Sequence, residues 1–265
     1  MGAALSVGLV LLLFMYHGSI TTSIPFATHN RYDNSRPQIP LRLLPLGDST
    51  TKGGMFDGEN SYRPALRNLL IGSGRTVDYI GNLTNGDHLD NKHEGHGGAL
   101  ISEIQAFIAE DEILLQHPNL VLLHAGTNDM NSVFGLAPQE PYEEGPARLE
   151  SLVDAVLCEC PDAVVVVSKI IRNTSWQTRV DAFNAAIDDI AVRRQAKGYK
   201  VWVADHSAIG GSDLISDGVH PSVLGYEKMA LAWFQAIQEF PSDWVQPARA
   251  PSLEPAPECR ARSRS

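Results

Sequence analysis

The sequence predicts a three-layer α/β/α sandwich with a mainly parallel sheet of roughly five strands, formed by residues 41–240. Two patterns lead to this prediction. Short apolar runs bounded by Gly, Pro or polar residues recur along the chain, as buried parallel strands do. Amphipathic stretches with helical spacing lie between these runs, and such strand–helix alternation is typical of α/β domains.

Five apolar runs are the predicted strands, and they are Leu41–Leu46, Val77–Ile80, Leu120–Ala125, Ala163–Ile170 and Lys200–Ala204. Helices are predicted over residues 147–157, 178–196 and 223–239, where apolar side chains recur at helical spacing. Parallel sheets of this class bind ligands at the carboxyl ends of their strands. We therefore expect the chemistry to lie just after the apolar runs.

The first residues of the chain have the pattern of an export signal. Ala3–Tyr16 is almost wholly apolar, is too short to span a bilayer of about 30 Å, and is followed by small and polar residues. This pattern indicates a signal peptide over residues 1–23 and an N-terminal segment over residues 24–40, although no Lys or Arg precedes the apolar run. A buried N-terminal helix is the alternative. With the signal removed, we expect a secreted, extracellular protein without stable membrane association.

The C-terminal end is rich in proline and poor in apolar residues, which predicts a disordered tail over residues 241–265. The three cysteines are too few for a fold built on disulfides. Cys259 in the tail has two candidate partners, Cys158 and Cys160. A bridge to either of them and three unpaired thiols are all compatible with the sequence.

Charge and glycosylation motifs bear on the partners. Lys and Arg number 21 against 31 Asp and Glu, which gives a net charge of −10. An acidic surface repels phosphate backbones and anionic lipid head groups, so nucleic-acid binding and peripheral membrane binding are disfavoured. Asn82-Leu83-Thr84 and Asn173-Thr174-Ser175 are N-glycosylation sequons, which matter only in a secretory lumen. We expect a monomer.

The loop after the last predicted strand contains Asp217-Gly-Val-His220-Pro. Asp and His three positions apart share one turn, so the carboxylate accepts a hydrogen bond from imidazole Nδ1–H and leaves Nε2 free as a base. A base oriented in this way needs a nucleophile. Ser49, in the Gly47-Asp48-Ser49 turn after the first strand, is the candidate. These side chains predict a Ser49–His220–Asp217 triad.

A hydroxyl that attacks a carbonyl creates an oxyanion, which needs preorganised N–H donors. Asn128, in the turn after the third strand, offers its side-chain amide, and Gly98 offers a backbone N–H without a Cβ to block the substrate. Each of these motifs is, by itself, also an ordinary turn. Asp48 and Asp129 are expected to brace their turns rather than to take part in chemistry.

Taken together and in this order, the motifs resemble those of the SGNH (GDSL) hydrolases, whose four blocks carry Ser, Gly, Asn and His. The blocks of this chain are Leu43–Gly53, Gly95–Gly98, Gly126–Asp129 and Asp217–Pro221. The resemblance covers residues 41–238 and implies a flavodoxin-like fold. It implies Ser49 as nucleophile, His220 as base and Asp217 as its partner. The backbone N–H groups of Ser49 and Gly98, with Asn128, are the implied oxyanion hole.

A narrower resemblance is to the acetyl xylan esterases of carbohydrate esterase family three. It lies in His93–Gly98, Leu122–Met130 and Gly225–Ala230. It implies a secreted serine esterase that removes acetyl groups from plant cell-wall polysaccharide through an acyl-enzyme. The substrate is then an acetylated polysaccharide or a small ester, and no metal or organic cofactor is required. That family often has Ser before the second-block glycine and Trp after it, whereas this chain has Gly97 and Ala99.

Three alternatives fit parts of the sequence. A broader GDSL esterase or lipase acts on lipid or aryl esters, and a non-catalytic carbohydrate-binding protein keeps the fold without the activity. A metalloenzyme would use the histidine and acidic residues around His93-Glu-Gly-His96, but this motif is one residue short of the HExxH helix motif. Trp202 and Trp233 are expected in the core. Trp176 and Tyr142, in predicted loops, are candidate sugar-stacking residues.

Overall fold

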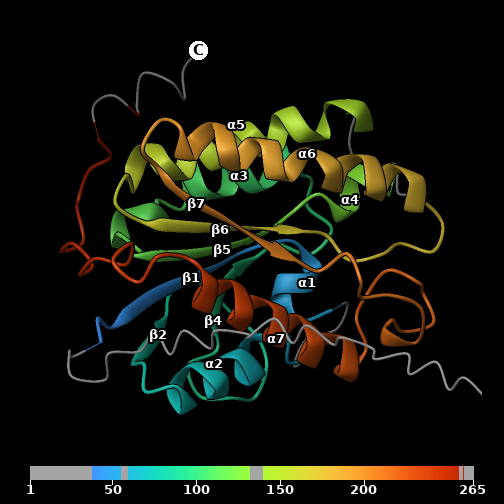
Figure 1. Cartoon of the computed structure of the whole chain (residues 1–265), viewed down its shortest axis with the longest axis horizontal. Coiled ribbons are helices and arrows are strands. Elements are labelled where there is room, and N and C mark those ends of the chain that lie inside the picture. Colours follow the sequence, from blue (N-terminus) through green and yellow to red (C-terminus); the bar gives the residue numbers. More distant parts are fainter. Residues whose placement is uncertain (1–37, 55–58, 132–139, 257–258, 260–265) are drawn as a thin grey trace, which may run out of the picture. The chain divides into compact units, whose positions relative to one another are not determined.

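A mostly parallel sheet lies at the centre of the computed structural model, which describes residues 38–54, 59–131, 140–256 and 259 (Figure 1). Within these residues the strands are β1 (Leu41–Gly47), β2 (Val77–Tyr79), β3 (Leu83–Thr84), β4 (Lys92–Gly95), β5 (Leu120–His124), β6 (Val164–Lys169) and β7 (Lys200–Asp205). β1 pairs with β5 along one side, and β6 and β7 continue the sheet in parallel. On its other side β1 pairs with β2 and, at its carboxyl end, with β4, to which β3 is antiparallel.

Helices cover both faces of this sheet (Figure 1). One face is packed by α3 (Ile101–Glu110), α5 (Gly145–Glu159) and α6 (Gln177–Gln195), and the other by α2 (Arg63–Gly72) and α7 (Val223–Glu239). The short helical elements are α1 (Ser49–Lys52), α4 (Thr127–Met130) and the 3₁₀ turns η1 (Ile113–Gln116), η2 (Tyr142–Glu144) and η3 (Gly211–Asp213). Both α1 and α4 follow the carboxyl ends of strands.

The alternation of side chains along β1 divides the core into two layers. Leu44 and Leu46 contact the layer of α3, α5 and α6, whereas Leu41 and Leu43 contact the layer of α2 and α7. All four side chains are buried. Because both faces are covered, the strand sequence is a continuous apolar run rather than an alternating one.

The predicted three-layer sandwich is confirmed. The five predicted strands occur as β1, β2, β5, β6 and β7, and the three predicted helices correspond to α5, α6 and α7. β3 and β4 are not predicted by the sequence. β4 has the sequence Lys-His-Glu-Gly and is held by pairing with β1 and β3, so it carries no apolar run that could signal a strand.

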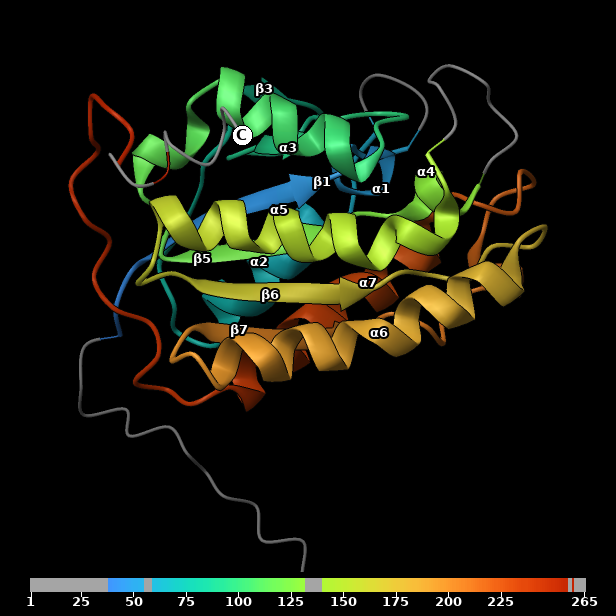
Figure 2. The same ribbon diagram turned by 90° about the horizontal axis from the view of Figure 1, so that it is seen from above.

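Residues 241–256 pack along the amino-terminal ends of the strands, where the sequence predicts a disordered tail over residues 241–265 (Figure 2). Val245 is buried, and the carbonyl oxygen of Gln246 accepts a hydrogen bond from Asn119 Nδ2 at 2.9 Å. A proline-rich backbone has few partners of its own, but polar groups at the edge of the domain supply them. The ordered part of the chain therefore extends beyond the predicted boundary at residue 240.

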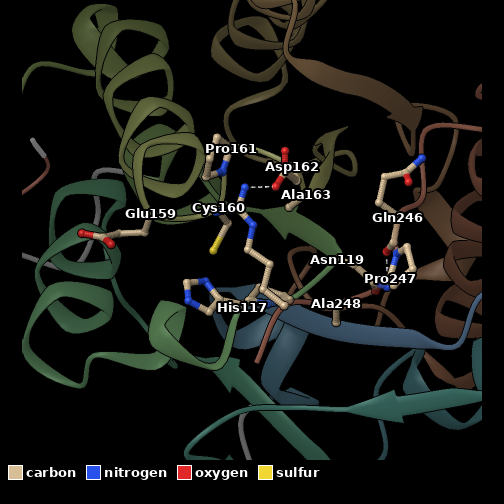
Figure 3. A pocket seen from close by; sticks show the side chains of 12 residues that line it. His117, Asn119, Glu159, Cys160, Pro161, Asp162, Ala163, Gln246, Pro247 and Ala248 are labelled. Carbon is tan, nitrogen blue, oxygen red and sulfur yellow. Dashed lines mark hydrogen bonds and ion pairs between the residues drawn. The ribbon is translucent and has the colours of Figure 1, made fainter. Parts of the chain in front are cut away.

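A disulfide fixes the far end of this segment. Cys259 is bonded to Cys158 near the end of α5, which is one of the pairings that the sequence leaves open. Cys160 is a free, buried thiol, and burial raises its pKa to about 12. Figure 3 shows Cys160 beside a small cavity, with Gln246, Pro247 and Ala248 of the C-terminal segment on the opposite side.

Loss of this disulfide is expected to lower the free energy of unfolding by about 2–4 kcal/mol, because the bridge closes a long loop. The two cysteines are 101 residues apart in sequence. Urea unfolding with and without dithiothreitol measures the effect, and Cys259→Ser serves as a control that should no longer respond to the reductant. A wild-type midpoint that is unchanged by reduction would contradict the prediction.

The predicted signal peptide, and residues 24–37 of the N-terminal segment, lie outside the described residues. The described residues all belong to one unit that begins at Gln38. Among them, no helix has the length and apolar character needed to cross a membrane.

Candidate active site

The nucleophile candidate Ser49 lies in a tight turn between β1 and α1. At Gly47 a Cβ would lie 2.0 Å from the carbonyl oxygen of His124, so the close approach of β5 requires glycine here. The carboxylate of Asp48 accepts a hydrogen bond from the N–H of Thr50 at 2.9 Å and so caps α1. These contacts place Ser49 as the first residue of α1, at the carboxyl edge of the sheet.

Ser49, His220 and Asp217 form a continuous hydrogen-bonded chain. Ser49 Oγ lies 2.8 Å from His220 Nε2, and His220 Nδ1 lies 2.7 Å from Asp217 Oδ2. The serine is 171 residues from the histidine in sequence. The fold thus brings together the three side chains that the sequence predicts as a triad, in the order that proton transfer from the hydroxyl to the imidazole requires.

Asp217 is held in place by its own loop. Its Oδ1 accepts hydrogen bonds from the backbone N–H groups of Val219 and His220, both at 2.9 Å. Partial burial raises the pKa of this carboxyl, but these two hydrogen bonds and the His220 imidazole outweigh it and hold the pKa below its usual value. The ionised carboxylate accepts a hydrogen bond from Nδ1–H, which leaves Nε2 unprotonated toward Ser49.

The two other oxyanion-hole candidates lie in adjoining turns. The N–H of Ala99 donates to the carbonyl oxygen of His96 at 3.2 Å, which closes the turn that contains Gly98. Gly98 has φ +79°, a conformation that favours glycine, and a Cβ there would contact no protein atom. Asn128 Nδ2 donates to the Ala99 carbonyl oxygen at 2.9 Å, and its second N–H is the one available to an oxyanion.

Asp48 and Asp129 brace their turns, as the sequence predicts. Asp129 accepts hydrogen bonds from the N–H of Ile101 at 3.0 Å and from the guanidinium of Arg148, which ties α4 to α3 and α5. Burial raises the pKa of Asp129 in spite of the arginine. Burial also favours the protonated form of Asp48, but the His124 imidazole and the hydrogen bonds it receives hold the pKa below its usual value.

The residues of the His-Glu-Gly-His motif are each engaged by protein groups. The buried Glu94 accepts hydrogen bonds from the N–H of Asn82 and lies 2.9 Å from His96 Nε2. His93 Nδ1 accepts from the N–H of Gly95, and burial lowers the pKa of His93 to about 3. Within the described part of the chain, no three His, Cys, Asp or Glu side chains are grouped as metal ligands.

The candidate sugar-stacking residues Tyr142 and Trp176 lie on either side of one arginine. The Arg179 guanidinium is 4.1 Å from the centre of the Tyr142 ring and 4.0 Å from that of Trp176. One face of each ring is thus covered by a cation, and the structure shows no contact between these rings and the triad. Trp233 is buried as expected, and Trp202 is partly buried against Trp244.

Arg63 supports the site and is not predicted by the sequence. Its buried guanidinium donates to the carbonyl oxygens of Lys52, at the end of α1, and of Asn85, in the β3–β4 connection, at 2.9 and 3.0 Å. It therefore links the nucleophile helix to the neighbouring loop. An arginine in the first turn of an amphipathic helix is usually solvated, so no sequence signal marks this one.

Known proteins share the sequence pattern and the fold of this chain. Residues 46–228 match the GDSL-like Lipase/Acylhydrolase family. The chain is 28% identical over 230 residues to the multidomain esterase of Ruminococcus flavefaciens, and the matched region is 76% of this chain. It spans only 29% of the length of that relative.

Two solved structures share the fold. The Clostridium thermocellum family 3 carbohydrate esterase is 28% identical, with a TM-score of 0.65 over 78% of this chain and 100% of its own. A carbohydrate esterase family 3 protein from Talaromyces cellulolyticus is 23% identical, with a TM-score of 0.67 over the same shares. The latter likeness shows the fold alone. The resemblance to carbohydrate esterase family three that the sequence motifs indicate is thus confirmed.

Proposed function

Because the chain belongs to the GDSL-like lipase/acylhydrolase family, we propose that it is a serine esterase that removes acetyl groups from plant cell-wall polysaccharide. The observation that carries the proposal is the hydrogen-bonded chain from Ser49 Oγ through His220 to Asp217. It lies at the carboxyl edge of a parallel sheet, where α/β proteins bind their ligands. The likeness to a family 3 carbohydrate esterase supports the choice of a carbohydrate ester.

The proposed reaction has two steps. Ser49 Oγ attacks the acyl carbonyl carbon while His220 Nε2 takes the hydroxyl proton, which gives a tetrahedral oxyanion. The oxyanion accepts hydrogen bonds from the N–H groups of Ser49 and Gly98 and from Asn128, at about 3 kcal/mol for each donor. His220 then returns the proton to the sugar oxygen that leaves, and Ser49 keeps the acetyl group as an ester.

Water completes the cycle. It attacks the acetyl-serine carbonyl while His220 accepts its proton, and collapse of the second oxyanion releases acetate and restores the Ser49 hydroxyl. Asp217 stays ionised throughout and stabilises the imidazolium that forms in each step.

Acetate release from acetylated xylan, measured beside p-nitrophenyl esters of rising chain length, tests the substrate class. We expect acetate release and a preference for the acetyl ester. A preference for long acyl chains would favour a lipase-like enzyme, and no turnover of any ester would favour a carbohydrate-binding protein without activity.

Export to the extracellular space is part of the same proposal, and the two sequons give a test of it. Asn173 is buried, and its Oδ1 accepts hydrogen bonds from the N–H groups of Ser175 and Trp176. Asn82 is exposed, and its Nδ2 only donates to the carbonyl oxygen of Asp111.

For protein secreted by a eukaryotic host under its own leader, we expect a glycan on Asn82 and none on Asn173. Peptide mass spectrometry after enzymatic deglycosylation measures the occupancy of each site. A glycan on Asn173 of the folded protein would contradict the prediction, and retention of the whole chain inside the cell would contradict export.

A further inference from the structure

A buried histidine lies directly beneath the nucleophile turn and has no part in the proton transfers described above. His124 is the last residue of β5, its side chain is fully buried, and its Nδ1 lies 3.5 Å from Asp48 Oδ1. The Asp48 side chain is fully buried as well. Two buried polar side chains in contact are costly to desolvate, so this pair directly beside the Ser49 turn calls for a physical reason.

His124 contacts the nucleophile turn with both its backbone and its side chain. Its carbonyl oxygen accepts a hydrogen bond from the N–H of Asp48 at 3.3 Å and is the atom that requires glycine at residue 47. Its imidazole Nδ1 lies 3.5 Å from Asp48 Oδ1, and the same oxygen accepts a hydrogen bond from the N–H of Thr50 in α1. The position of α1, and with it Ser49, therefore follows that of His124.

His124 is also close in sequence to the oxyanion loop. Asn128 follows it by four residues. The buried Asp48 carboxylate thus joins the Ser49 turn to the end of β5, from which the Asn128 loop starts.

We infer that His124 is a positioning residue, whose contacts with Asp48 fix the Asn128 amide relative to Ser49 Oγ. This role rests on the proposed ester hydrolysis. The oxyanion is carried by the carbon atom that bonds to Ser49 Oγ, so its position is fixed relative to Ser49, and a donor misplaced by about 1 Å loses much of its effect, on the order of 10- to 100-fold in rate.

A double-mutant cycle tests this role. His124→Leu is expected to lower kcat for p-nitrophenyl acetate on the order of 10- to 100-fold with little change in KM. In an Asn128→Ala background, the same change is expected to cost less than about threefold, because the donor that His124 positions is already gone. An equal loss in both backgrounds would assign His124 a purely structural role and overturn the inference.

His206 offers a matched control. It is fully buried at the end of β7, its ring centre is 5.9 Å from that of His124, and its ring contacts Trp233. No contact joins it to Asp48 in the described structure. His206→Leu is therefore expected to lower the melting temperature as His124→Leu does, while kcat stays within about twofold. A loss of kcat as large as that of His124→Leu would count against a specific role for His124.

Removal of the imidazole leaves the buried Asp48 carboxylate without its contact to His124, which can prevent folding. The cycle is then measured with Asp48→Asn present in all four proteins, since the asparagine oxygen still accepts the Thr50 N–H. In this background too, the role is supported if the loss of kcat caused by His124→Leu nearly disappears in the Asn128→Ala protein. It is overturned if the loss of kcat is the same with and without Asn128. Turnover by the wild-type enzyme tests the proposed function separately, so a failed cycle rejects the role of His124 alone.

Discussion

Replacement of Ser49 by Ala is expected to lower kcat for acetyl esters by about 10⁶-fold and to leave the fold intact. A loss of this order follows removal of a catalytic serine, because the acyl-enzyme route is lost and only the oxyanion donors and substrate binding remain. Ser49 is buried at the start of α1, and its hydroxyl contacts His220. The change therefore removes a single hydroxyl group from a packed turn. Steady-state hydrolysis of p-nitrophenyl acetate measures the loss.

Ser168→Ala is the matched control for this change. Ser168 is a buried serine at the carboxyl end of β6 whose hydroxyl has no hydrogen-bond partner in the described structure. We expect this variant to keep kcat within about twofold of wild type. Labelling of the wild type by a fluorophosphonate probe, and its loss in Ser49→Ala alone, identifies the nucleophile. Near-normal turnover by Ser49→Ala would remove Ser49 from that role.

Asp217→Asn is expected to lower kcat by about 10⁴-fold. The amide that replaces the carboxylate keeps the shape of the loop but can donate a proton to His220 Nδ1, which places the remaining imidazole proton on Nε2 and removes the base that faces Ser49. Asp217 Oδ1 accepts hydrogen bonds from the backbone N–H groups of Val219 and His220, and Oδ2 lies 2.7 Å from His220 Nδ1. Because Oδ1 already has two donors, the amide nitrogen of the asparagine takes the place of Oδ2 and faces His220 Nδ1. The pH profile of kcat/KM is the readout. The variant should recover part of its activity at high pH, where hydroxide can take the Ser49 proton in place of the imidazole.

Asp213→Asn provides the comparison for this variant. Asp213 lies four residues earlier in the chain and pairs with Lys228 at 2.6 Å, without contact to His220. Because Lys228 is half exposed, loss of this pair should cost little stability, and kcat should stay within about twofold. Equal losses in Asp217→Asn and Asp213→Asn would show that the loop, rather than the tautomer, is at fault.

The strands and the turns after them were predictable because the signals are local. Burial on both faces makes a parallel strand a continuous apolar run, and glycine marks the points where the chain must turn closely. β4 was not predictable, since Lys92–Gly95 owes its conformation to pairing with β1 and β3. The packed segment 241–256 was missed for a related reason. Its partners, such as Asn119, come from distant parts of the chain.

The sequence by itself determined the fold class and predicted Ser49, His220 and Asp217 as a triad, because hydrophobic period and residue spacing are properties of the chain alone. Only the tertiary structure decided that Cys259 pairs with Cys158 rather than Cys160. It also decided that Arg63 and His124 are buried next to the segment that carries Ser49. The physical reason is the same in each case. These contacts join residues that are far apart in sequence, and burial changes what a thiol, a guanidinium or an imidazole does.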